Sequence, residues 1–410
     1  MKRRRECSDW RVETWLAGHP GVARALADAL LFGEQVDTAE ELAFARGMEC
    51  TKEALRARLV KGGALDRLAD TLVDAFSKLQ AAEMASAAEL HDKFVLDGSA
   101  FTLQLGGLDK FYSGLDGIVG SASPNVHDAM RRDHCEMNDS AVAFDMPNRR
   151  AKTTSTIEWC FVVNPKEGSD GNGAPFAPYP KETNSRRPQS FEEFGPELRQ
   201  RNAALADIGQ PAVGREEFYG ARLYTGPMYL KYNAVLRGRQ FESARAIFEE
   251  LCSGNTYATT LHCINSSIIK FSKLTKAARV YRGVSGGVLP ESCRVSNAFN
   301  VRGGVEGGFM STTTDHDKAL DYARGGADAA KRGGSAILFE SQMGMVDRGA
   351  DVGWLSEFPH EAEILFAPLT GMEVRGSRVE GSVQIYEVAL TVNMASLTIE
   401  QVVARPLTLE

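Results

Sequence analysis

The order of secondary structure after Gly214 is the feature of this sequence that most limits its fold. Residues 228–237, 241–251 and 257–271 repeat apolar side chains with helical spacing. The strand-like segments come after them, at residues 279–282, 308–311, 335–339, 362–366 and 383–390. Helices followed by strands, with short connections between them, predict an α+β fold class.

The rest of the chain divides by composition. Its 410 residues, 43% hydrophobic and 25% charged, are ordinary for globular domains and predict two or three of them. Seven of the 15 prolines lie within residues 164–213, where they predict a linker broken by one short polar helix near residues 195–206. In the mixed segment before this linker, residues 94–96, 101–105, 141–144 and 156–163 have the composition of strands. The predicted division is a mostly helical module at 1–93, a small mixed α/β segment of unknown role at 94–163, the linker at 164–213, the α+β domain at 214–396 and a tail at 397–410.

Charge and cysteine usage predict a cytoplasmic protein. The net charge of -7 gives no reason to expect a nucleic-acid partner, and the basic run at residues 2–5 is either a solvated terminus or a localisation signal or surface anchor. We find neither a secretory signal nor an apolar run of the roughly 18 to 20 residues that a membrane span needs. The seven cysteines are widely spaced without a CxxC pair, so we expect reduced thiols and no metal site.

Three segments of the α+β domain bear the side chains with the clearest chemistry. Arg282 ends one apolar strand, a hydroxyl cluster at residues 311–313 ends a second, and Glu361 and Glu363 lie two residues apart on a third. Side chains two apart on a strand share a face, with Cα atoms roughly 6 to 7 Å apart, so we expect both carboxylates to point into one cleft. The arginine fork suits phosphate oxygens and the hydroxyls suit ribose. Together the segments predict a site for a small anionic ligand that contains ribose, such as NAD.

Each segment alone also has an ordinary structural explanation. A Glu-x-Glu pair is commonly the solvent-facing side of an edge strand, and hydroxyl residues before Asp315 are commonly a helix cap. An arginine after a tyrosine is commonly a surface pair. Their occurrence together and in order favours the site.

The segment from about 279 to 375 resembles the arginine, serine, glutamate class of mono-ADP-ribosyltransferases, which bacterial toxins and vertebrate cell-surface enzymes share. The matching segments are residues 281–283 (Tyr-Arg-Gly), residues 309–313 (Phe-Met-Ser-Thr-Thr, with Thr313 where the family has serine) and residues 361–363 (Glu-Ala-Glu). Tyr229, Tyr232 and Asn233 extend the resemblance more diffusely to about residues 214–396. It implies a split β-sheet domain preceded by helices.

The resemblance also implies which residues bind NAD. Arg282 would contact the diphosphate, and the backbone of Gly283 would bond to the nicotinamide carboxamide. Ser311 and Thr312 would orient the nicotinamide ribose and the catalytic carboxylate. Tyr322 matches the position of an aromatic residue that stacks on nicotinamide.

The two glutamates would divide the reaction between them. Glu363 would be catalytic, stabilising an oxocarbenium-like transition state as nicotinamide leaves, and Glu361 would receive the arginine of an acceptor protein. Arg324 lies one place from the position of the family's phosphate-binding arginine. NAD would be consumed as a substrate, and no metal would be needed.

Two other functions remain open at this stage. One is NAD glycohydrolysis, in which water intercepts the same cation, and the other is a catalytically silent NAD-binding scaffold. Redox use of NAD is disfavoured because the glycines at residues 303–308 lack GxGxxG spacing and are typical of a flexible turn.

Overall fold

The computed structural model describes residues 101–102, 105, 114–137, 140–146, 149–165, 186, 188–297, 301–325, 336–393 and 395–404. The helical module predicted at residues 1–93, the strand predicted at 94–96 and much of the predicted linker lie outside these residues. In the part of the chain that is described, no helix is long and apolar enough to cross a membrane.

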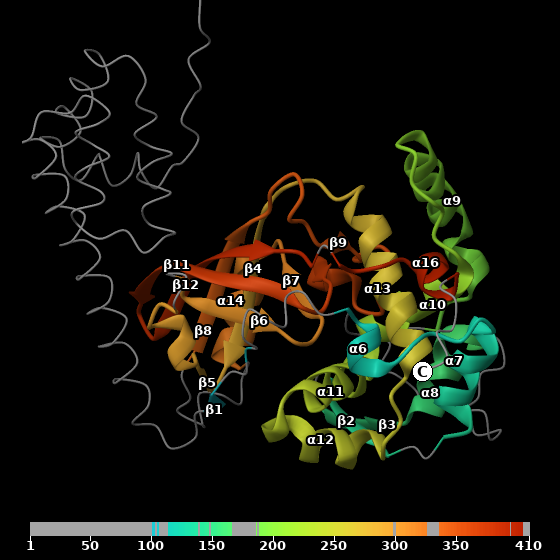
Figure 1. Ribbon diagram of the computed structural model, residues 1–410, viewed down its shortest axis with the longest axis horizontal. Coiled ribbons are helices and arrows are strands. Elements are labelled where there is room, and N and C mark those ends of the chain that lie inside the picture. The colour runs from blue at the N-terminus through green and yellow to red at the C-terminus, as the bar shows by residue number, and fades with distance from the viewer. Residues whose placement is uncertain are drawn as a thin grey trace, which may run out of the picture.

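An eight-stranded mixed sheet is the largest assembly among the described residues (Figure 1). In spatial order its strands are β6 (Gly303–Glu306), β11 (Thr370–Glu380), β12 (Val383–Thr391), β8 (Ala336–Gln342), β4 (Arg279–Ser285), β7 (Met310–Thr313), β10 (Glu363–Phe366) and β9 (Ala350–Asp351). Strands β12 and β8 pair in parallel, and all the other neighbours in this sheet pair antiparallel.

The sheet opens between β4 and β7. These two strands are in register only at Tyr281 and Thr313, whereas β4 follows β8 from Arg279 to Ser285. A five-stranded part and a three-stranded part therefore meet at one residue pair and diverge from it. This is the split sheet that the resemblance implied, and the predicted α+β class is confirmed.

The helices lie mostly beside the β9 end of this sheet, except for α14 (His316–Arg324), which packs against β4 and β8 (Figure 1). In chain order they are α6 (Asp116–Val119), α7 (Val126–Cys135), α8 (Ser155–Val163), α9 (Phe191–Asp207), α10 (Arg215–Leu223), the π-helix η3 (Tyr224–Met228), α11 (Tyr229–Gln240), α12 (Glu242–Cys252), α13 (Ala258–Ser272), α14 (His316–Arg324) and α16 (Ile399–Val403). The short elements are β1 (Phe101–Thr102), which pairs with β5 (Gly287–Val288), β2 (Val142–Met146), which pairs with β3 (Arg149–Thr153), and the 3-10 turns η4 (Glu291–Cys293) and η5 (Pro359–Glu361).

One hydrophobic core joins the helices to the β9 end of the sheet. Phe218 of α10 and Leu261 of α13 belong to it together with Leu365 of β10. Trp159 of α8 and Phe194 of α9 are buried in the same cluster. The domain boundary at residue 214 remains a prediction, and the described residues before and after it share this core.

Two predicted elements were wrong. Residues 156–163, predicted as a strand, form most of helix α8, which Thr154 caps by accepting a hydrogen bond from the amide of Ile157 (3.3 Å). Phe161 and Val162 are almost completely buried, so the helix is apolar nearly all round, and a fully buried helix has the composition of a buried strand.

The glycine-rich residues 303–306, predicted as part of a flexible turn, form strand β6 instead. Gly303 has φ +144°, and a Cβ atom there would lie 1.9 Å from the carbonyl oxygen of Met372 on β11. The glycine is therefore needed for close pairing of two strands and does not mark a turn.

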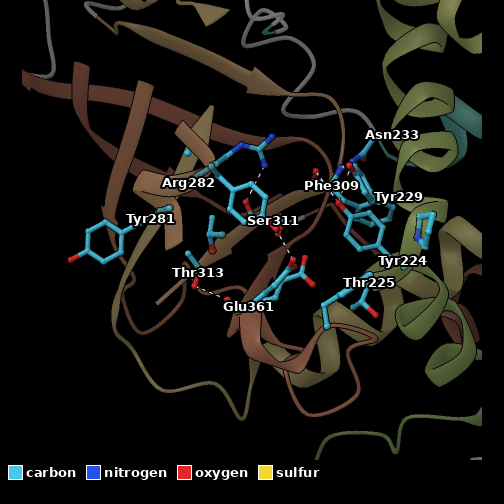
Figure 2. Close-up of a pocket in the computed structure, with 18 of the residues that line it drawn as sticks. Tyr224, Thr225, Tyr229, Asn233, Tyr281, Arg282, Phe309, Ser311, Thr313 and Glu361 are labelled. Atoms are coloured by element: carbon cyan, nitrogen blue, oxygen red, sulfur yellow. Dashed lines mark hydrogen bonds between the residues drawn. The ribbon is translucent and has the colours of Figure 1, made fainter. Parts of the chain in front are cut away.

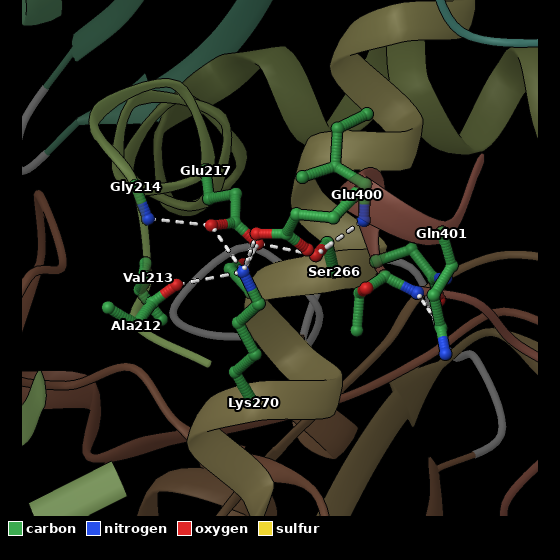
Figure 3. Close-up of polar contacts among 12 residues, drawn as sticks. Ala212, Val213, Gly214, Glu217, Ser266, Lys270, Glu400 and Gln401 are labelled. Carbon is green, nitrogen blue, oxygen red and sulfur yellow. Dashed lines mark hydrogen bonds and ion pairs between the residues drawn. The ribbon is translucent and has the colours of Figure 1, made fainter. Parts of the chain in front are cut away.

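An ionic cluster centred on the buried Lys270 joins helix α16 to α10 and α13 (Figure 3). The ammonium group of Lys270 on α13 donates to Glu217 of α10 (2.7 Å), to Glu400 of α16 (2.6 Å) and to the carbonyl of Ala212 (2.9 Å). The hydroxyl of Ser266 donates to Glu217 and accepts from the amide of Ile399 (2.8 Å). Three helices that are distant in sequence thus meet at one cation.

Candidate active site

A cavity of about 470 Å³ lies where β4 and β7 diverge (Figure 2). Its volume is within the roughly 300 to 1,000 Å³ of typical ligand pockets. The predicted site residues that line it are Arg282, Gly283, Ser311, Thr312, Tyr322, Glu361 and Glu363. All seven therefore come together at one place in the fold.

Glu363 and Ser311 form the centre of the cavity wall. Glu363 begins β10 opposite Thr313 of β7, and Ser311 lies two residues before Thr313, hence on the same face. The Ser311 side chain is hydrogen-bonded to the Glu363 carboxyl group. Burial raises the pKa of Glu363 to about 7, and nearby Glu361 adds to the rise, while the Ser311 hydrogen bond and Arg282 oppose it.

Cationic groups form the end of the cavity beside β4. The Arg282 guanidinium donates to the backbone carbonyl of Ser311 (3.1 Å), and burial lowers its pKa. Arg237 of α11 donates from Nε to the buried carboxylate of Glu306 (3.1 Å), which also accepts from the amide of Gly308 (2.9 Å). Burial alone would raise the pKa of Glu306, but the two arginines outweigh it and the pKa is lowered. Two guanidinium groups facing one carboxylate leave a net positive charge, which suits the phosphates of a ligand.

Sequence reasoning missed Arg237 and Glu306. The only sequence signal for Glu306 is its place among the glycines at residues 303–308, and these glycines predict a turn. Arg237 had no signal, because it is one of several charged residues on a helix.

Glu361 does not lie on a strand, which corrects the prediction that it shares a strand face with Glu363. It ends the turn η5, and Ala362 after it has φ +48°, so the alternation of side chains begins only at Glu363. The hydroxyl of Thr313 donates to the backbone carbonyl of Glu361 (2.7 Å), and that of Tyr322 donates to its side-chain Oε1 (2.5 Å). Both carboxylates line the same cavity because the turn places Glu361 there, and not because the two residues share one face of a strand.

Thr312 and Gly283 have structural tasks that the sequence did not reveal. The Thr312 hydroxyl donates to the backbone carbonyl of Ile364 (2.7 Å) and thereby joins β7 to β10. A Cβ atom on Gly283 would lie 2.0 Å from the backbone carbonyl oxygen of Ala319 on α14. The absent side chain of Gly283 is thus required for helix packing, and its contact with a ligand remains a prediction.

The N-terminal cap of helix α14 follows the hydroxyl cluster and is not made by it. The side chain of Asp315 accepts from the amides of Asp317 and Lys318. The cap is therefore made by Asp315, while Ser311, earlier in the same run, faces the cavity. Arg324 is exposed at the end of this helix.

Aromatic residues form the wall opposite the sheet (Figure 2). The hydroxyl of Tyr224 accepts from Asn233 Nδ2 (3.1 Å), and Asn233 Oδ1 accepts from the amide of Phe309 (2.8 Å). The rings of Tyr224 and Phe309 contact edge to face at 5.1 Å. These contacts tie the helices to the start of β7, and Tyr229 remains 45% exposed beside them.

The donor set of the cavity suits the parts of a dinucleotide. Within the described ranges, no group of three or more His, Cys, Asp or Glu side chains is arranged to hold a metal. The cavity instead combines guanidinium groups, hydroxyls, aromatic rings and a buried carboxylate, which match phosphate, ribose and a flat heterocycle.

Comparisons with known proteins give slight likenesses. No protein-family model and no curated protein matches the sequence. Among solved structures, the Vis toxin, an ADP-ribosyltransferase from Vibrio splendidus, has 17% identity over 52% of this chain and 93% of its own, with a TM-score of 0.34. HopU1 of Pseudomonas syringae pv. tomato DC3000, also an ADP-ribosyltransferase, has 16% identity over 49% of this chain and 85% of its own, with a TM-score of 0.33. The eucaryotic mono-ADP-ribosyltransferase ART2.2 has 13% identity over 49% and 79%, with a TM-score of 0.29. Likenesses of this size do not assign a function.

Proposed function

We propose that this protein transfers the ADP-ribosyl group of NAD to arginine side chains of an acceptor protein and releases nicotinamide. The observation that carries the proposal is the position of Glu363, a buried carboxyl group hydrogen-bonded to Ser311 in a cavity whose other end holds Arg282. The order of these residues in the sequence and their resemblance to the arginine, serine, glutamate transferases support it further.

Glu363 acts on the bond that breaks. When the bond between ribose C1′ and the nicotinamide nitrogen opens, the electron pair leaves with nicotinamide and positive charge develops on the ribose. An ionised carboxylate fixed in a cavity of low polarity stabilises that charge, as in glycoside hydrolysis. Ser311 holds the carboxylate in place, and Arg282 binds the diphosphate.

Glu361 acts on the bond that forms. A guanidinium group stays protonated at neutral pH and is a poor nucleophile. As one of its nitrogens attacks C1′, Glu361 aligns the group and accepts the proton that it loses. The products are nicotinamide, ADP-ribosyl-arginine and one proton, so the charges and atoms balance.

The test is an incubation with NAD and agmatine, a small guanidinium acceptor. We expect the wild type to yield both nicotinamide and ADP-ribosyl-agmatine. Glu363→Gln should lower both products about 100-fold or more, which is the loss typical of one preorganised electrostatic group. Glu361→Gln should lower agmatine transfer much more than nicotinamide release. Glu249→Gln, an exposed carboxylate on α12, is the matched control and should behave as the wild type.

Each alternative function has its own outcome in this assay. Free ADP-ribose as the only ribosyl product, with every acceptor offered, identifies a glycohydrolase. NAD that raises the melting temperature without any release of nicotinamide identifies a silent scaffold. Full activity of Glu363→Gln contradicts the catalytic assignment.

A further inference from the structure

The hydrogen bond between Tyr322 and Glu361 joins two elements at the rim of the cavity. Glu361 belongs to the three-residue turn η5, and Tyr322 belongs to helix α14. The Tyr322 hydroxyl donates to Glu361 Oε1 at 2.5 Å. Because Tyr322 is 57% exposed, its hydroxyl had water as an alternative partner, so burial alone does not explain this contact.

The two ends of this hydrogen bond are held very differently. Helix α14 is capped by Asp315 at its start and by Gly325 in the left-handed conformation at its end. Its backbone at Ala319 lies directly on Gly283 of β4. The Glu361 side chain, in contrast, projects from the end of a three-residue turn, where the Thr313 hydroxyl donates to the carbonyl of Glu361 (2.7 Å) and the amide of Glu361 donates to the carbonyl of Phe358 (3.0 Å). The rigid partner is therefore Tyr322, and the group that it orients is Glu361.

We propose that the Tyr322 hydroxyl is a positioning group that sets acceptor specificity, by holding the Glu361 carboxylate in the orientation that receives a guanidinium group instead of water. This inference rests on the proposed function and deepens it. Stacking on nicotinamide needs only the aromatic ring, so the hydroxyl is available for a second task. A carboxylate that is already ordered spares the acceptor the entropy of ordering it.

The consequence concerns the competition for one intermediate. The oxocarbenium-like ribose is captured either by an arginine nitrogen, with the proton going to Glu361, or by water, which yields free ADP-ribose. A disordered Glu361 carboxylate impairs the first route more than the second. The ratio of transfer to hydrolysis therefore reports on the Tyr322 hydroxyl.

The experiment compares the wild type with Tyr322→Phe, which keeps the ring and removes the hydroxyl. With NAD and agmatine, ADP-ribosyl-agmatine and free ADP-ribose are measured in the same reaction. We expect their ratio to fall about tenfold, the factor for one hydrogen bond to a charged group, with the KM for agmatine rising more than the KM for NAD. Tyr386→Phe is the matched control, since it removes a hydroxyl that donates to Gln384 (2.7 Å) on β12, and its ratio should equal that of the wild type.

Three outcomes overturn the inference. A product ratio in Tyr322→Phe within about twofold of the wild type shows that the hydroxyl does not act on the acceptor. Equal losses of both products show a structural or NAD-binding role in place of a positioning one. A wild type that makes no ADP-ribosyl-agmatine overturns the proposed function together with this inference, whereas the first two outcomes leave the proposed function standing.

Discussion

At the scale of single residues, the chemistry depends on the protonation of Glu363. Burial holds the pKa of this carboxyl group at about 7, whereas an ordinary glutamate ionises near 4.5. Only the ionised form can stabilise a cation on the ribose. Burial strengthens the electrostatic interaction between the Glu363 carboxylate and the ribose cation. Because burial also raises the pKa of Glu363, less of the carboxyl group is ionised in acidic solution.

The activity should follow this ionisation. We expect kcat/KM for NAD to rise with pH, with its half-maximal value near pH 7, because this constant reports the free enzyme. Since the Ser311 hydrogen bond lowers the pKa of Glu363, Ser311→Ala should move the rising limb to higher pH. Initial rates of nicotinamide release from about pH 5 to about pH 9 test both points. A flat profile for the wild type, or a shift to lower pH in the variant, contradicts the assignment of Glu363.

At the scale of secondary-structure elements, the site depends on how closely α14 lies on β4. An added methyl group at Gly283 would meet the backbone of Ala319 at 2.0 Å and that of Ala323 at 2.6 Å. Backbone atoms of a helix cannot turn aside as a side chain can, so the whole helix must shift. A shift of α14 also displaces Tyr322 from Glu361.

We therefore expect Gly283→Ala to lower the free energy of unfolding by about 1 to 3 kcal/mol, the usual cost of overpacking. It should also lower agmatine transfer more than a change in stability explains. Chemical denaturation and the transfer assay measure the two effects. Gly344→Ala is the control, because a Cβ atom there has nothing within 4 Å. An unchanged stability of Gly283→Ala contradicts the close contact between α14 and β4.

The elements also show what could be predicted from the sequence. The helices after residue 214, the five strands and the three polar segments were predictable because each has a regular apolar period or an ordered motif. The alternation of polar and apolar residues predicts a strand that includes Glu361, but the strand begins only at Glu363. Pro359 marks the turn that comes before it. Helix α8 was predicted as a strand because a helix that is buried on most sides lacks the apolar period that distinguishes a helix from a strand in the sequence.

At the scale of the whole molecule, the contacts that hold the site join residues far apart in sequence. The guanidinium group of Arg186 pairs with Glu158 of α8 (2.7 Å) and with Glu357 (2.9 Å), four residues before Glu361. All three side chains are completely buried. Burial raises the pKa of Glu357 to about 7, with Arg186 opposing the rise. Such a cluster has no local sequence signal, because each member resembles an ordinary surface charge until the fold brings them together.

The contribution of such distant contacts to the stability of the fold can be measured at the ionic cluster around Lys270. Burial raises the pKa of Glu217, and Lys270 is the first of the groups that oppose the rise. Lys270→Met would leave this carboxylate buried without its cation, which typically costs about 3 to 5 kcal/mol, and would remove one of the polar contacts between α16 and α13. We expect a loss of unfolding free energy of about 3 kcal/mol at neutral pH, measured by chemical denaturation.

The pH dependence of that loss identifies its cause. When the folded-state pKa of an acid lies above its unfolded value, the folded state binds the proton more tightly, so stability falls as pH rises through that interval. The deficit of Lys270→Met should therefore shrink as the solution is acidified and Glu217 becomes neutral. Adding Glu217→Gln should recover most of it at neutral pH, because the unpaired charge is then gone. Lys318→Met, which breaks a partly exposed pair with Asp315, should cost much less than Lys270→Met. A deficit that does not change with pH, or that persists in the double variant, would mean that Lys270 stabilises the fold through packing of its side chain and not through its charge.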